Sequence, residues 1–301
     1  MVMALILSLA VLALSFIPHA LAQTLCNGHE ALCSRSYSNV TFIGTHGSPF
    51  YGDPPLVTEN QEKSPTEQLN DGIRYLQAQT HKNPAEQLSV CHTDCLLENG
   101  GTLENYLSTM KIWLDANPNE VVSLLLTNGD SLDIGEFDLA FKNVGIDTYA
   151  FQALSQVAIT DWPTLGDLIS ANTRLIIFLD YGADESKVPY ILNEFNYYFE
   201  TPFDWTDAAF NQCSIDRPTG SSAEGKMYIV NHFLDINLFG SGVLIPDRAA
   251  APTTNAAVGS GSIGAQSDLC EGLYGRAPNV VLVDYYNVGD VFEAQAALNG
   301  L

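Results

Sequence analysis

The chain has 301 residues, with 35 acidic and 12 basic side chains and a formal net charge of −23 at pH 7. This length suits one α/β domain with a sizeable core. The excess of acid excludes nucleic acid as a partner, because binding to a phosphate backbone needs clustered Lys and Arg.

Residues 1–22 have the features of a secretory signal peptide. The uncharged stretch Met1–Ile17 ends at Pro18, and Ala20-Leu21-Ala22 forms a small-residue cleavage site. The alternative is an N-terminal membrane anchor, but the apolar stretch is shorter than the roughly 20 residues that cross a bilayer. We therefore expect a secreted, extracellular protein with no transmembrane anchor in the mature chain, residues 23–301, which forms a single domain.

Six cysteines in an oxidising compartment indicate disulfides. The simplest pairing joins Cys26 to Cys33, Cys91 to Cys95, and Cys213 to Cys270. A zinc site around Cys91-His92-Thr93-Asp94-Cys95 is the alternative, but no second pair of cysteines or histidines completes a set of four ligands.

Short apolar runs alternate with helical segments, which is typical of parallel strands that are covered on both faces. The predicted strands are Thr41–Thr45, Tyr75–Gln79, Leu88–His92, Val121–Thr127, Leu175–Tyr181, Met227–Asn231 and Val280–Tyr285. Periodic apolar residues predict helices along the stripe from Leu103 to Leu114, at Val188–Phe199 and at Val291–Leu298. This alternation favours a TIM-type (β/α) barrel, irregular or incompletely closed because an eighth strand is not apparent.

In such a barrel the C-terminal strand ends share one face, where active sites lie. Polar side chains expected there are His46, Gln79, His92, Asp180, Asn231 and Asp284. His81 and His232 also lie near strand ends, but we expect them in loops. Two imidazoles at strand ends indicate a general acid and a general base, and Asp284 could orient His46. The alternatives are two structural histidines, or a glycosidase whose carboxylate pair is Asp180 and Asp284.

Five segments resemble the phosphatidylinositol-specific phospholipase C (PI-PLC) X-domain superfamily, specifically its secreted fungal PLC-like phosphodiesterase branch. They are Gly44–Ser48, Gly72–Gln79, Val90–Thr93, Asn117–Val122 and Val281–Tyr285, in the family's order along the mature chain. The resemblance implies a TIM-type barrel that cleaves an inositol- or glycerol-type phosphodiester through a cyclic phosphate.

In that scheme His46 is the general base, His92 is the general acid, and Asp284 orients His46. The substrate would be a small phosphodiester or a lipid headgroup. The candidates for binding it are Gln79, Lys82, Asp180, Asn231 and Tyr285.

The chain departs from the family at positions that hold the phosphate or a metal. Gly47 follows His46 where active bacterial relatives carry Asp, and Gln77 and Gln79 stand where those relatives carry Asp and a phosphate-binding Arg. Calcium-dependent relatives place acidic ligands at these positions, where this chain has Gln77 and Gln79, so we expect no metal cofactor; calcium is the alternative. Lys82, just past the strand, is a candidate replacement for the arginine, but the favoured interpretation is an ordinary solvated lysine.

We therefore expect a phosphodiesterase of weak or altered activity. The alternative from another class is a catalytically idle barrel that binds an extracellular ligand, and a glycosidase is the third hypothesis.

Overall fold

The computed structural model describes residues 25–153 and 155–301, so the predicted signal peptide lies outside the described residues. Eight strands run parallel: β1 (Phe42–Thr45), β2 (Tyr75–Lys82), β5 (Val122–Asn128), β6 (Leu175–Leu179), β7 (Ile191–Asn193), β8 (Tyr198–Glu200), β9 (Met227–Asn231) and β12 (Val280–Val283). Their order is β7-β6-β5-β2-β1-β12-β9-β8. Among the described residues no ladder joins β7 to β8, so the sheet curls into an incompletely closed barrel, which confirms the predicted fold class.

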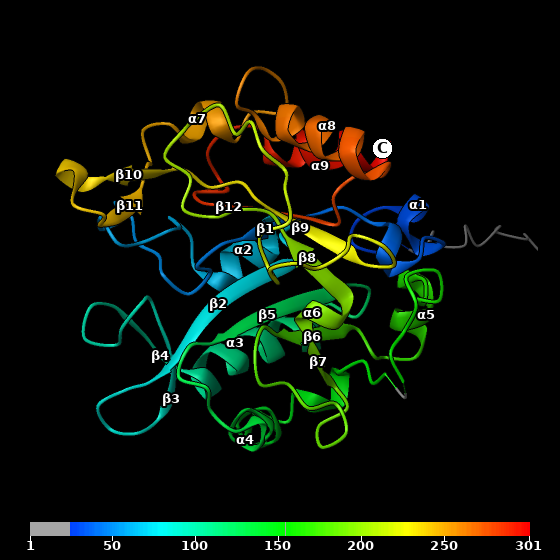
Figure 1. The fold of residues 1–301 in the computed structure, drawn as a ribbon. Helices are drawn as coiled ribbons and strands as arrows, with labels where there is room; N and C mark the ends of the chain where they lie inside the picture. The colour runs from blue at the N-terminus through cyan, green and yellow to red at the C-terminus, as the bar shows by residue number, and fades with distance from the viewer. Residues whose placement is uncertain (1–24, 154) are drawn as a thin grey trace, which may run out of the picture.

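The remaining elements surround or extend this barrel (Figure 1). The helices are α1 (Glu30–Cys33), α2 (Pro65–Asp71), α3 (Leu103–Ala116), α4 (Ile134–Val144), α5 (Leu165–Ser170), α6 (Glu194–Tyr197), α7 (Ala251–Thr254), α8 (Ile263–Tyr274) and α9 (Val291–Asn299), with short 3₁₀ turns at Tyr37–Asn39, Asp147–Tyr149 and Leu238–Gly240. Two antiparallel strands, β3 (Leu88–Cys91) and β4 (Asn99–Thr102), extend β2, while β10 (Asp235–Asn237) and β11 (Leu244–Pro246) form a separate hairpin. In Figure 1, α8 and α9 lie beside β12 and β9, whereas α3 and α4 lie beside β5 and β6.

Two sequence predictions about these elements are wrong. The segment Leu88–His92 is not a parallel barrel strand, because β3 folds back antiparallel against β2. The segment Val188–Phe199 is not one helix but contains β7, the single-turn α6 and β8. Most of its apolar residues are buried, and β-branched and aromatic side chains in such a run favour extended strands.

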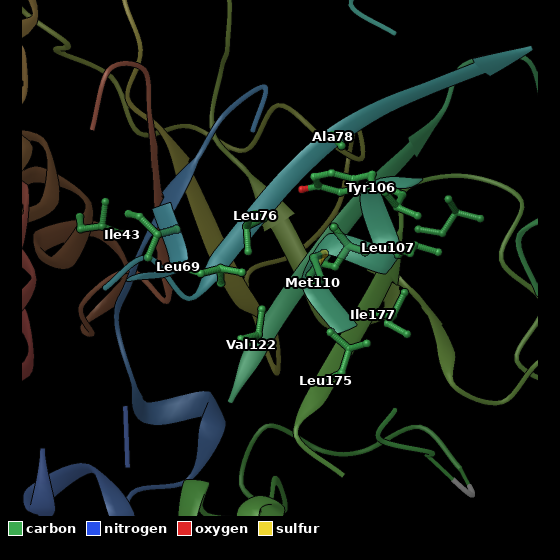
Figure 2. Packing of buried hydrophobic residues seen from close by; sticks show 14 of the residues in the cluster. Ile43, Leu69, Leu76, Ala78, Tyr106, Leu107, Met110, Val122, Leu175 and Ile177 are labelled. Carbon is green, nitrogen blue, oxygen red and sulfur yellow. The ribbon is translucent and has the colours of Figure 1, made fainter. Parts of the chain in front are cut away.

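Alternation along β2 separates the outer core from the barrel interior. Leu76 and Ala78 face outward and pack against Leu107 and Met110 of α3, as Figure 2 shows. Full burial of a side chain such as Leu107 contributes about 1.5–3 kcal/mol as an upper estimate. The alternate residues of the strand point inward, so Gln77 and Gln79 face the interior of the barrel.

The three predicted disulfides are present, at Cys26–Cys33, Cys91–Cys95 and Cys213–Cys270. Within the described part of the chain, no group of three or more His, Cys, Asp or Glu side chains is placed to hold a metal ion. No helix in residues 25–153 or 155–301 is long and apolar enough to cross a membrane.

Candidate active site

A cavity of about 490 Å³ opens at the C-terminal ends of the barrel strands. Side chains from β2, β5, β8, β9 and β12 form its wall, together with residues from the loops that follow the strands. Four of the predicted site residues line this cavity, namely His46, Gln79, Asp180 and Asn231. The barrel therefore brings together residues that lie up to 185 positions apart, counted from His46 to Asn231 (231 − 46).

His46 follows β1 directly and is fixed by three neighbours. Its Nδ1 lies 2.9 Å from Oδ1 of Asp284, which follows β12, the strand paired with β1. Because a carboxylate only accepts, Nδ1 carries the proton and Nε2 is left free to act as a base. Phe233 stacks on the imidazole with ring centroids 3.8 Å apart and planes within 4°. The Asn60 amide donates to Oδ2 of Asp284 at 3.3 Å, so the carboxylate is oriented on both oxygens.

Asn60 also explains why Gly follows the first histidine. Gly47 has φ +56°, and a Cβ at this position would lie 2.2 Å from Oδ1 of Asn60. An L-residue is strained in this backbone region, and the overlap adds a steric clash. The acidic residue that bacterial relatives carry here therefore has no space in this chain.

Strand β2 holds the loops of both histidines through two glutamines on its inner face. Oε1 of Gln77 accepts the backbone N–H of Gly47, which follows His46, at 2.8 Å. Oε1 of Gln79 accepts the backbone N–H of Thr93, which follows His92, also at 2.8 Å. Each oxygen thus accepts a backbone bond, and neither glutamine supplies a carboxylate, so these residues do not fit a calcium site of the kind that calcium-dependent relatives build from acidic ligands.

His92 reaches this region from the β3–β4 hairpin rather than from a barrel strand. The disulfide Cys91–Cys95 closes a short loop around it, and Thr93 next to it lines the cavity. The ring packs against Phe50 at 5.1 Å between centroids. Burial, together with the nearby charge of His46, lowers the pKa of His92 to about 4. The free protein therefore holds His92 neutral at neutral pH.

Two carboxylates, those of Asp180 and Glu200, line the same cavity. Burial raises the pKa of Asp180 to about 6, although its Oδ1 accepts the backbone N–H groups of Asn128 and Tyr181. The Asn231 amide donates to Glu200 at 2.8 Å. Glu200 also accepts a bond from Arg217 at 2.5 Å. The Asn231 amide is therefore engaged in a hydrogen bond within the cavity wall, whereas the positively charged Arg217 lines the cavity.

Two predicted binding residues lie outside the cavity. The Lys82 ammonium pairs with Glu136 on α4, beyond the inner face of β2. The Tyr285 side chain is buried, and its hydroxyl donates to the carbonyl of Glu59 at 2.8 Å. Lys82 therefore does not stand in for the missing arginine in this structure.

Sequence patterns did not identify Asn60, Phe233, Glu200 or Arg217, because none belongs to the segments that resemble a family. The scarcity of basic residues, 12 in the chain, was the one signal that could have drawn attention to Arg217. His81 was expected in a loop but lies in β2, where it lines the cavity and bonds Asp130 at 2.8 Å.

His232 is fully buried, and its ring nitrogens contact Gln266 and Thr254. Of the histidines near strand ends, His232 is therefore a structural residue of the core.

Comparison with known proteins agrees with this geometry. The PI-PLC X 1 family model (PI-PLC_X) matches residues 32–299. The "PI-PLC X domain-containing protein 1" of Arthroderma benhamiae is 54% identical over 98% of this chain and 95% of its own length. An "Uncharacterized secreted protein" of the same fungus is 42% identical over 92% of this chain and 64% of its own length.

Solved structures show the same fold at much lower identity. The phosphatidylinositol-specific phospholipase C of Listeria monocytogenes aligns with a TM-score of 0.53 at 16% identity, covering 89% of this chain and 95% of that one. The corresponding enzyme of Staphylococcus aureus aligns with a TM-score of 0.56 at 14% identity, with the same coverages.

Proposed function

The chain belongs to the PI-PLC X-domain family, and on that premise we propose that it is a secreted PLC-like phosphodiesterase that cleaves an inositol- or glycerol-type phosphodiester by acid–base catalysis. The observation that carries this proposal is the His46–Asp284 pair, 2.9 Å apart at the edge of a polar cavity. A histidine oriented by a carboxylate is the usual form of a general base.

The proposed reaction has two steps. In the first, Nε2 of His46 takes the proton of a substrate hydroxyl, the resulting oxygen attacks phosphorus, and His92 donates a proton to the alcohol that leaves. In the second, His92 takes a proton from water, which opens the cyclic phosphate, and His46 returns its proton to the ring hydroxyl. Each histidine ends as it began.

The pKa of His92 bears on its role as an acid. With a pKa near 4, few free molecules carry the proton at neutral pH. A bound phosphodiester anion beside the ring would raise this pKa, because a nearby negative charge favours the imidazolium. Protonation of His92 would then accompany substrate binding, which fits weak activity at neutral pH and more activity in acid.

The test is cyclic phosphate formation from a panel of inositol and glycerol phosphodiesters, followed by ³¹P NMR. His46→Ala and His92→Ala should each lower kcat by a factor of about 10²–10⁴, the usual contribution of general acid–base catalysis. His29→Ala is the matched control, because His29 is exposed and lies outside the cavity. Turnover that survives both substitutions would contradict the mechanism.

The second candidate is a catalytically idle barrel that binds an extracellular ligand. The absence of the phosphate-binding arginine favours this candidate. Gln79 stands at that position, and its side chain holds the His92 loop instead. If the wild-type protein gives no turnover over the panel, with or without calcium, this candidate replaces the enzyme. The glycosidase hypothesis is weaker, because both oxygens of Asp284 are engaged with His46 and Asn60.

Secretion is part of the proposal. A secreted relative and three disulfides support it. N-terminal sequencing of protein recovered from the culture medium should begin at Gln23, whereas protein retained in the cell with residues 1–22 attached would argue for an anchor.

A further inference from the structure

Arg217 is held rigidly at the cavity wall by the segment that carries it. Residues 201–217 leave β8 and return to its edge, where the N–H of Glu200 donates to the carbonyl of Arg217 at 2.8 Å and the N–H of Asp216 donates to the carbonyl of Glu200 at 2.9 Å. The disulfide Cys213–Cys270 fastens the same segment to α8. The backbone of Arg217 is therefore fixed before any ligand arrives.

The guanidinium of Arg217 lines the cavity and keeps donors beyond its bond to Glu200. One Nη2 donates to Glu200 at 2.5 Å, and the group lies over the ring of Phe203 at 4.5 Å from the centroid. Its buried Nε has no partner among the described residues. Since a guanidinium has five N–H donors in a planar fork, the Glu200 bond leaves several of them for a ligand.

The charge of Arg217 acts on the same region as the catalytic pair. Among the described residues that line the cavity, Arg217 is the one Arg or Lys, and His46 lines the same cavity. His46 and Arg217 both act electrostatically on the carboxylate of Asp204, so the two side chains lie near the same carboxylate. A phosphate next to His46 would therefore lie within electrostatic reach of Arg217.

We propose that Arg217 binds the phosphate of the substrate and supplies, from the β8 side of the barrel, the positive charge that position 79 lacks. This inference rests on the proposed function. Arg donates to phosphate in a bidentate fork, which is the geometry that a phosphodiester anion needs. Glu200 competes with the phosphate for the guanidinium, so the affinity for anions is held below what a free arginine would give.

The competition with Glu200 makes the proposal testable without relying on turnover. The probe is inorganic phosphate at pH 6, titrated into the purified protein by calorimetry. Glu200→Gln should tighten phosphate binding about tenfold, because it removes the competing charge while keeping an acceptor for Asn231. The double variant Glu200→Gln/Arg217→Gln should weaken binding at least about tenfold relative to Glu200→Gln. Lys142→Gln, an exposed lysine on α4, controls for net charge and should leave binding unchanged.

Arg217→Lys guards against a folding artefact, since it keeps the charge beside Glu200 and loses only the planar fork. We expect KM for the phosphodiester to rise about tenfold with an unchanged circular dichroism spectrum. Arg217 would be a structural ion-pair residue only if the double variant bound phosphate like Glu200→Gln, or if Glu200→Gln changed thermal stability alone. Wild-type protein that binds no phosphate at millimolar concentration would also overturn the proposal.

The two proposals can fail separately. Phosphate binding that depends on Arg217 in a protein without turnover would uphold Arg217 and reject the enzyme. If the protein turns over substrate and KM is unchanged in all three variants at Arg217 and Glu200, the enzyme is upheld and the role of Arg217 is rejected.

Discussion

Replacing Gln79 with leucine should separate the positioning of the acid from the binding of substrate. Oε1 of Gln79 holds the N–H of Thr93 at 2.8 Å, directly after His92. Leucine is one atom shorter and accepts no bond, so the loop loses about 1 kcal/mol of restraint, a factor of about 5 in the population of the productive position. A displacement of about 1 Å at a reacting group can cost about 10² in rate. We therefore expect kcat to fall between about 5-fold and 100-fold, with KM within about twofold.

Steady-state kinetics on a phosphodiester found active in the panel, together with thermal denaturation, provide the assay. The melting temperature should drop by only about 2–4 °C, the shift expected for 1 kcal/mol in a domain of this size. Gln79→Glu is the matched control, because it keeps the acceptor for Thr93 and adds a charge that raises KM while kcat is retained. If Gln79→Leu raises KM and leaves kcat unchanged, then Gln79 contacts the substrate and the positioning argument is wrong.

Three further outcomes follow from the same site. Gly47→Asp should destabilise the protein by about 2 kcal/mol or more in urea denaturation, because its Cβ overlaps Asn60, and Asn60→Gly should relieve part of the loss; higher activity in the single variant would contradict this. Because the pKa of His92 in the free protein is about 4 and a bound anion should raise it, an NMR titration of the His92 ring should move its midpoint upward when inorganic phosphate is added; a midpoint that phosphate does not move would contradict the acid role. Burial, and next the charge of Asp284, raise the pKa of Asp235 to about 7, so the folded state binds more protons than the unfolded state between about pH 4 and 7 and stability falls as pH rises. Asp235→Asn should then gain about 1–2 kcal/mol at pH 8, a value reduced for partial exposure, and almost nothing at pH 4; equal gains at both pH values would contradict the assignment.

The barrel strands could be read from the sequence wherever an apolar run was continuous. Val122–Asn128 and Leu175–Leu179 are such runs, and both are buried strands. The segment around β7 and β8 was misread, because two strands of three residues each are too short to establish a period of two. The local sequence pattern does not show that β7 and β8 form the two edges of the barrel sheet and are therefore extended.

The candidate site was predictable only as far as it lies in recognisable segments. The segments around His46 and Asp284 predicted a pair, and the two side chains are hydrogen-bonded. Phe233 and Asn60 come from loops without periodicity, and only the folded chain shows that they contact His46 or its partner. The neighbours of Lys82 were equally invisible, since its partner Glu136 is 54 residues away.

The disulfide around His92 differs in kind from the one that fastens Arg217. Cys91–Cys95 spans 4 residues, and Cys213–Cys270 spans 57. On a loop-entropy estimate the shorter link stabilises the fold by about 2 kcal/mol and the longer one by about 4 kcal/mol. Reduction of Cys91–Cys95 alone would leave the barrel folded, but the loop that carries His92 would no longer be fixed in position relative to His46. A reducing solution would therefore abolish the catalytic activity before it unfolds the protein.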